Sequence, residues 1–300
     1  MPSPHSSANA DHLPIELVPH FEHLAPRYDV VLCDVWGVLH DGLSAFPEAG
    51  DALARFRGGG GRVVLVSNAP RPGASVASQL DGLGVPREAY DAVVTSGDLT
   101  RLIVAERTGK AVHHLGPERD LPLFAGLDTR FAPLDEADYV VCTGLFDDET
   151  ETIADYGQIL RRMRERGLWM VCANPDIVVE RGNKLIPCAG ALAAAYEAIG
   201  GETYTGGKPH RPIYERAIET AAGLGDAVPA PLPRVLAIGD AIRTDVAGGR
   251  AFGTDVLLIA RGIHAGDLGY RPGSVDEAKA LSWLASQDHR PTALAPELVW

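Results

Sequence analysis

Side chains suited to phosphoryl chemistry close or follow several apolar runs of this 300-residue chain. They are Asp34, Ser67, Asn68, Lys208, Asp240 and Asp245. A carboxylate nucleophile needs a partner cation, and a second pair of acids supplies the oxygen ligands that Mg²⁺ takes in proteins. A lysine neutralises charge on a transferring phosphoryl group, and a serine hydroxyl with backbone N–H groups holds its oxygens. Each residue alone also has a structural interpretation, as a cap, a loop entry or a solvated charge.

The apolar runs that carry these residues predict an α/β fold. They cover residues 28–34, 61–68, 90–97, 137–144, 168–176, 234–240 and 254–262. Continuous Val, Leu and Ile favour parallel strands covered on both faces. Amphipathic stretches between them predict helices over 148–167, 189–201 and 210–225. Because ligands bind at the carboxyl ends of parallel strands, we expect the polar residues there to form one site.

The spacing of the candidate residues predicts an insertion. Ser67 and Lys208 lie 141 positions apart, far more than one crossover between parallel strands needs.

Three further segments are not expected to form regular elements. The segment 58–61 is interpreted as the end of a helix, and residues 228–233 as a proline-rich loop. The first 14 residues are interpreted as a polar tail rather than a signal peptide.

The order of these residues resembles the haloacid dehalogenase superfamily of phosphohydrolases. The stretches DVWGVLHDG, VSNAPRP, TSGD, ANPD, GKPHRPIYERAI and GDAIRTDVAGG narrow the resemblance to the NagD-like, p-nitrophenylphosphatase-type branch, over residues ~28 to ~262. The resemblance implies a Rossmann-like parallel-sheet core, residues 1–100 and 204–300. It also implies an inserted α/β class II cap, residues 101–203.

Carried over residue by residue, the resemblance implies the following roles. Asp34 is the nucleophile that forms an aspartyl-phosphate, and Lys208 bridges it to the phosphoryl group. Ser67, Asn68 and Asn174 bind phosphate or substrate. Mg²⁺ is the cofactor, held by Asp34, Asp240, Asp245 and the backbone carbonyl of Trp36. The substrate is then a small phosphomonoester.

Trp36 departs from the pattern of this family, whose phosphatases carry a second aspartate two positions after the nucleophile. That aspartate protonates the leaving alcohol and activates the water, whereas an indole N–H is only a donor. One interpretation is a slow phosphatase whose acid–base group comes from elsewhere, with His40 or Asp41 as nearby candidates. A second is a non-hydrolytic phosphate-binding or regulatory protein. A dehalogenase is a third, disfavoured because such enzymes work without Mg²⁺ and this chain keeps an acid pair.

Other residues and folds give weaker alternatives. Asn174 and Asp176 could touch substrate or form an Asx-Pro turn. Arg71 and Arg243 could read an anionic substrate tail or be solvated. The long interval before Lys208 argues against a receiver domain, and no P-loop motif occurs.

Composition bounds the partners. The apolar fraction of 46% and charged fraction of 22% are those of a globular protein, and the net charge of −13 disfavours nucleic acid and anionic membranes. The four cysteines show no metal-site spacing and are expected to be reduced and buried. We therefore expect a cytoplasmic enzyme, with a possible homodimer by analogy to capped relatives.

Overall fold

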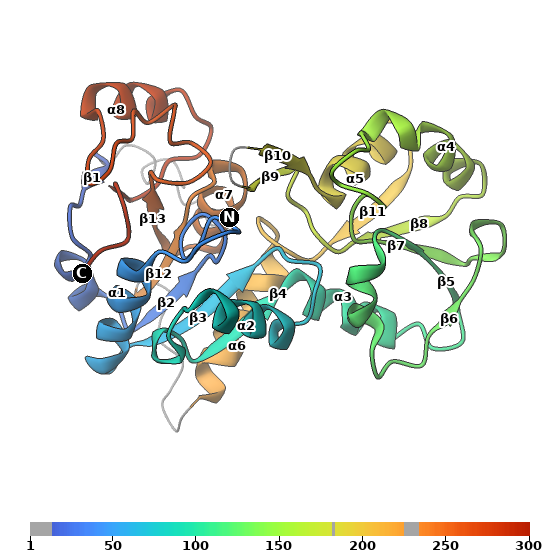
Figure 1. Cartoon of the computed structure of the whole chain (residues 1–300), viewed down its shortest axis with the longest axis horizontal. Helices are drawn as coiled ribbons and strands as arrows, with labels where there is room; N and C mark the ends of the chain where they lie inside the picture. Colours follow the sequence, from blue (N-terminus) through green and yellow to red (C-terminus); the bar gives the residue numbers. More distant parts are fainter. Residues whose placement is uncertain (1–13, 182–183, 225–233) are drawn as a thin grey trace, which may run out of the picture.

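The computed structural model describes residues 14–181, 184–224 and 234–300, so the predicted N-terminal tail (apart from Pro14) and the proline-rich loop lie outside the described residues. Two parallel sheets occupy opposite ends of the long axis, with a β-hairpin between them (Figure 1). No helix among the described residues is long and apolar enough to cross a membrane.

The larger sheet has seven strands in the order β1-β14-β13-β12-β2-β3-β4, and every neighbouring pair is parallel. In that order the strands are Glu16–Leu17, Ala293–Ala295, Asp255–Ile259, Val235–Gly239, Val30–Cys33, Arg62–Ser67 and Ala92–Thr95. The sequence order and the sheet order differ, so β2 lies between β12 and β3. The two strands that carry Asp34 and Asp240 are therefore neighbours.

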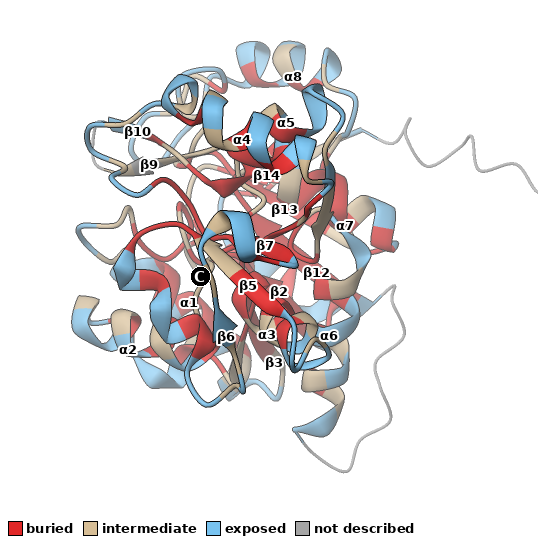
Figure 2. Cartoon of the chain, turned by 90° about the vertical axis from the view of Figure 1, so that its right-hand side faces the viewer, coloured by how far each residue is buried: buried red, intermediate tan, exposed pale blue. Residues whose placement is uncertain are grey.

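Alternating residues of β2 supply two separate hydrophobic cores. Val31 and Cys33 pack in the core that holds α1 (Pro47–Gly58) and α2 (Gly73–Leu83). Val30 and Leu32 face α6 (Arg211–Gly223) on the other side. All four residues are buried, which explains the continuous apolar run. Figure 2 shows buried residues concentrated in the central strands and exposed residues on the outer faces of the helices.

The second sheet is built from the chain between β4 and β12. It has five parallel strands in the order β11-β8-β7-β5-β6, namely Glu202–Thr205, Trp169–Cys172, Tyr139–Cys142, Ala111–Leu115 and Arg130–Phe131. One face packs against α4 (Gly157–Glu165) and α5 (Ala189–Ala198). The α/β class and the parallel, Rossmann-like core are as the sequence predicts. The division at residues 101 and 203 stays a prediction.

The remaining elements include a β-hairpin, three α-helices and a π-helical turn. The antiparallel hairpin pairs β9 (Val178–Arg181) with β10 (Lys184–Pro187). The other α-helices of the described residues are α3 (Ser96–Ala105), α7 (Ala247–Phe252) and α8 (Glu277–Ala285). A short π-helical turn, Ile242–Val246, joins β12 to α7.

The predicted helix over 148–167 begins later than its amphipathic pattern. The helical part starts with a 3-10 turn at Ile153–Tyr156, and α4 follows from Gly157. Thr152 and Asp155 form a capping box at this start, which fixes the helix N-terminus. Before Thr152, Asp148 and Glu149 instead lie in a turn and form ion pairs.

Candidate active site

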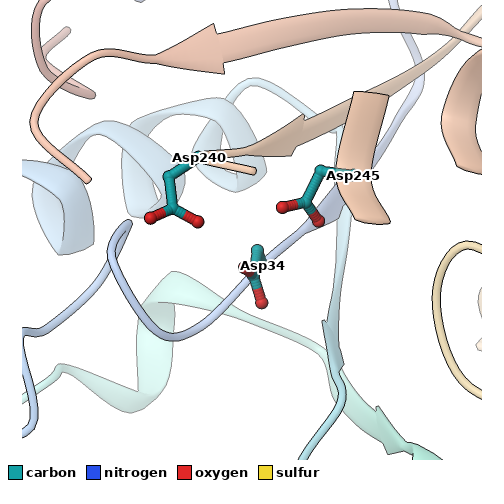
Figure 3. A group of neighbouring side chains, drawn as sticks. All are labelled: Asp34, Asp240 and Asp245. Carbon is teal, nitrogen blue, oxygen red and sulfur yellow. The ribbon is translucent and has the colours of Figure 1, made fainter. Parts of the chain in front are cut away.

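Three carboxylates converge at the carboxyl ends of β2 and β12. Asp34 follows β2, Asp240 follows β12, and Asp245 lies on the π-helical turn after it (Figure 3). Ligand oxygens of the three lie within 4.8 Å of one another, and all three residues are buried. The parallel pairing of β2 with β12 produces this convergence, because it places both carboxyl ends at one edge.

Lys208 lies directly against this acidic trio. Its Nζ is 2.7 Å from Asp34 Oδ1 and 2.8 Å from Asp245 Oδ1, and the lysine is 3% exposed. Three carboxylates and one ammonium leave two negative charges uncompensated when all are ionised. A divalent cation with oxygen ligands has the charge and the ligand preference to occupy such a site.

The electrostatics reflect this excess of negative charge. Burial and the neighbouring Asp245 and Asp240 carboxylates hold the pKa of Asp34 well above its usual range, although Lys208 opposes the shift. Burial and Asp245 raise the pKa of Asp240 to about 7. Burial by itself lowers the pKa of Lys208, but Asp245 and Asp34 raise it well above its ordinary value. The lysine therefore stays charged.

Two glycines allow the backbone to approach Asp240. Gly37 has φ +78°, and a Cβ added there or at Gly262 would overlap the Asp240 carboxylate. One oxygen of Asp240 accepts a hydrogen bond from Ile263 N at 2.8 Å. The loop after β2 and the loop after β13 thus fix this carboxylate, and larger residues would displace it.

Asn68 connects three parts of the site. Its Oδ1 accepts from Lys208 N at 2.8 Å, and its Nδ2 donates to Lys208 O at 3.1 Å. The same Nδ2 donates to Asp176 Oδ1 at 2.8 Å. The structure thus places the Asn68 amide on the Lys208 backbone, and its predicted phosphate contact stays a prediction.

Two cavities, of about 340 and 380 Å³, adjoin at Trp36, Asp176 and Val179, which line both of them. Asp34 and Asp240 line the first, and Ser67 and Asn174 line the second. Ser67 Oγ accepts from Ala69 N at 3.2 Å. Volumes near 300 Å³ lie at the low end for small-molecule sites and therefore favour a small substrate. The binding roles of Ser67 and Asn174 stay predictions.

Trp36 is one of the residues that line both cavities. Its ring centroid is 5.0 Å from that of His40 in an edge contact, and a Cβ at Gly42 would lie 2.5 Å from its Cζ2 atom. The tryptophan is held by its loop, and it brings an apolar surface to the place where the cavities meet. Its carbonyl as a metal ligand stays a prediction.

Several residues that line the second cavity were missed by sequence reasoning. They are Arg119 and Asp120 after β5, Asp148 after β7, and Arg181 in the hairpin. Asp148 accepts hydrogen bonds from Arg119 and Arg181. Arg119 could have been found from the strand that precedes it, Ala111–Leu115. That strand was not recognised because His113 and His114 interrupt its apolar pattern.

The residues weighed as secondary candidates are placed as follows. Arg71 lines the second cavity and donates to Gln79 Oε1 at 2.8 Å, whereas Arg243 is exposed and lines neither cavity. His40 is 1% exposed, and burial lowers its pKa to about 4. Asp41 lines the first cavity but accepts from Leu43 N and Ser44 N at 2.9 and 2.8 Å.

Comparison with known proteins assigns the family. A model described as haloacid dehalogenase-like hydrolase matches residues 31–130, and one described as HAD-hydrolase-like matches residues 205–299. Glycerol-3-phosphate phosphatase of Gallus gallus is 30% identical over 259 residues, 78% of this chain and 80% of that protein. The chain belongs to the haloacid dehalogenase-like hydrolases. The resemblance predicted from the sequence is confirmed.

Solved structures agree with the assignment of this hydrolase to the family. A haloacid dehalogenase-like hydrolase from Brucella suis 1330 has a TM-score of 0.82 and 47% identity, covering 96% of this chain and 100% of that one. A glycerol phosphate phosphatase from Mycobacterium tuberculosis, solved in complex with magnesium, has a TM-score of 0.64 and 26% identity. The match covers 91% of this hydrolase and 76% of that chain.

Proposed function

We propose that this hydrolase is a Mg²⁺-dependent phosphatase of a small phosphomonoester, with Asp34 as the nucleophile. The observation that carries the proposal is the position of Lys208 Nζ, 2.7 Å from Asp34 Oδ1 and 2.8 Å from Asp245 Oδ1. A buried lysine that contacts both the proposed nucleophile and Asp245 of the acidic pair fits a site for a dianionic phosphoryl group.

The chain's own residues divide the work as follows. Asp34 attacks phosphorus and becomes an aspartyl-phosphate, while Lys208 stabilises the charge on the transferring group. Ser67 and the backbone at the end of β3 hold the phosphoryl oxygens. Burial excludes water from the reacting atoms, and the second sheet, proposed as the cap over residues 101–203, contributes the walls that select the substrate.

The residues present fit a bound Mg²⁺. The trio offers hard oxygen ligands, and together with Lys208 it carries an excess of two negative charges. The cation would be held by Asp34, Asp240 and Asp245, with the Trp36 carbonyl as a further ligand. When bound, it neutralises phosphate and carboxylate charge that would otherwise repel.

The substrate class follows from size and from the relatives. Cavities of about 340 and 380 Å³ suit a compact phosphomonoester. Two related proteins are named as phosphatases of glycerol phosphate. We therefore propose glycerol phosphate and similar alkyl phosphates as the first substrates to try.

The test is hydrolysis of p-nitrophenyl phosphate and glycerol 3-phosphate with Mg²⁺, by the wild type and the Asp34→Asn variant. Asp29→Asn is the matched control, because Asp29 lies at the other end of β2 in an exposed pair with Arg234. We expect wild-type turnover, at least a hundredfold loss in Asp34→Asn and little change in Asp29→Asn. Turnover that is absent, or unchanged in Asp34→Asn, overturns the proposal. Phosphate binding without turnover would favour the non-hydrolytic alternative.

A further inference from the structure

Phosphomonoester hydrolysis by Asp34 leaves one chemical task without a residue. The leaving alkoxide needs a proton, and the water that cleaves the aspartyl-phosphate must lose one. The side chain at position 36 is an indole, which cannot exchange a proton in this range. The residue that replaces it must be titratable and must line the space in front of Asp34.

The acidic residues of the two cavities can be sorted by what already holds them. Asp34 and Asp240 belong to the trio. Hydrogen bonds from Ser44 and Leu43 N–H lower the pKa of Asp41 below its ordinary value, although burial opposes them, so Asp41 is a poor proton donor. Asp148 is bound by two arginines, and Asp120 lines only the second cavity.

Asp176 differs from all of these. Three of the described residues line both cavities, namely Trp36, Asp176 and Val179, and of these Asp176 is the one with a titratable side chain. It lies in the segment between β8 and β9 and reaches the site from the second sheet. Its Oδ1 accepts from Asn68 Nδ2 at 2.8 Å, and that amide also holds the backbone of Lys208. Asn68 therefore links Asp176 to Lys208, the residue that contacts Asp34.

We propose that Asp176 is the general acid and base of this hydrolase, in place of the residue that Trp36 displaces. The inference rests on the proposed phosphatase activity and adds to it. In this proposal Trp36 transfers no proton. It forms an apolar wall of the space in which Asp176 meets the leaving group.

Protons and bonds balance through the two steps. As Asp34 Oδ bonds to phosphorus, the bond to the leaving oxygen breaks, and the protonated Asp176 gives its proton to that oxygen, releasing an alcohol. The Asp176 carboxylate then takes a proton from water as the water oxygen bonds to phosphorus. The bond between phosphorus and Asp34 breaks, inorganic phosphate leaves, and Asp176 is again protonated.

The surroundings of Asp176 suit this alternation. Burial raises the pKa of its carboxyl above the ordinary value. Lys208 and the hydrogen bond from Asn68 lower the pKa of Asp176, and Asp245 raises it. The carboxylate of Asp240 is close enough for Asp176 to raise the pKa of Asp240. A carboxyl with a raised pKa keeps a protonated fraction closer to neutral pH, as a general acid requires.

The test compares leaving groups in Asp176→Asn. This variant keeps an acceptor oxygen for Asn68 Nδ2 and replaces the titratable carboxyl by an amide that does not titrate. p-Nitrophenolate leaves without a proton, whereas the alkoxide of glycerol 3-phosphate does not. We expect kcat/KM for glycerol 3-phosphate to fall about 10²–10⁴-fold. For p-nitrophenyl phosphate we expect a fall of less than about tenfold, with a burst of p-nitrophenol as phosphorylated Asp34 accumulates.

Two further variants separate a proton-transfer role from a structural one. Trp36→Asp in the Asp176→Asn background supplies an acid at the family's usual position, and we expect it to restore glycerol 3-phosphate turnover. Asp128→Asn, at an exposed site, is the matched control. Equal losses for both substrates, or no rescue by Trp36→Asp, overturn the role of Asp176. Wild-type protein that hydrolyses neither substrate instead overturns the proposed function itself.

Discussion

Asn68 and Lys208 are joined through two hydrogen bonds between one side-chain amide and one residue's backbone, at 2.8 and 3.1 Å, across 140 positions of sequence. This contact fixes the loop from which the Lys208 ammonium reaches Asp34. It ties the end of β3 to the segment that follows β11.

Replacement of Asn68 by alanine removes this support. The Lys208 N–H and C=O and the Asp176 carboxylate lose a buried partner, so we expect the free energy of unfolding to fall by about 2–3 kcal/mol. We expect kcat to fall more than KM rises, because the lysine is displaced while other phosphate contacts remain. Steady-state kinetics and urea unfolding measure both effects. Gln287→Ala, at a half-buried amide just after the end of α8, serves as the control. A rise in KM with unchanged kcat would instead favour direct phosphate binding by Asn68.

Gly42 fixes the ring of Trp36. Gly42 has φ +89°, and a Cβ there would lie 2.5 Å from Trp36 Cζ2. Gly42→Ala is expected to cost about 1–3 kcal/mol of stability and to move the indole, with a change in tryptophan fluorescence. Gly109 has φ +85° with no atom near its missing Cβ, so Gly109→Ala carries only the backbone cost of about 1 kcal/mol. If the two variants match in stability and in fluorescence, Gly42 does not position Trp36.

His40 gives the fold a dependence on pH. Burial lowers its pKa from 6.5 to about 4, so the unfolded chain binds this proton more readily than the folded chain. Stability from this residue is complete above pH 6.5 and is lost as the pH falls toward 4. We expect about 2 kcal/mol of loss between pH 7.5 and 5 from His40. Denaturant unfolding of His40→Gln should show a shallower pH slope, whatever its absolute stability. An unchanged slope would contradict the assignment.

Asp240 is expected to destabilise the protein when no cation is bound. Its pKa of about 7 lies above the ordinary 3.8, because burial and Asp245 penalise the charged form. Above pH 7 its ionisation therefore opposes folding, and Asp240→Asn should raise the free energy of unfolding by about 2–4 kcal/mol without Mg²⁺. Mg²⁺ should raise the melting temperature of the wild type and of the exposed-site control Asp288→Asn, but not of Asp240→Asn. An Asp240→Asn variant that Mg²⁺ stabilises as it does the wild type would remove Asp240 from the metal site.

The strands that precede Asp34 and Asp240 could be predicted because their sequences are unambiguous. β2 and β12 are buried on both faces, so each reads as a continuous apolar run that stops at an aspartate. β5 and β11 have polar residues such as His113 and Thr203, and the pattern of a buried strand is lost there. Asp34, Asp240 and Asp245 could be identified because each lies at or soon after the end of such a strand, and a strand end is a local feature of the sequence.

The contacts that support those residues could not be predicted in the same way. The partner of Asn68 lies 140 positions away, and only the tertiary fold decides whether its amide meets a phosphate or a backbone. The same holds for Asp176, whose ANPD stretch is equally compatible with a local turn. His40 and Asp41 were candidates because they are near Asp34 in sequence, whereas Asp176 reaches the cavities from another sheet.

The position of β2 between β3 and β12 also bears on how the chain is made. Val30–Cys33 is synthesised before its partner Val235–Gly239, which follows some two hundred residues later. Until then, the nascent larger sheet has an open hydrophobic edge at β2, the strand that Asp34 follows. Asp34, the proposed nucleophile, also lacks Asp240 and Asp245 during that interval. The site therefore cannot assemble before β12 and Asp245 have been synthesised, and fragments that end before β12 carry an aggregation-prone edge.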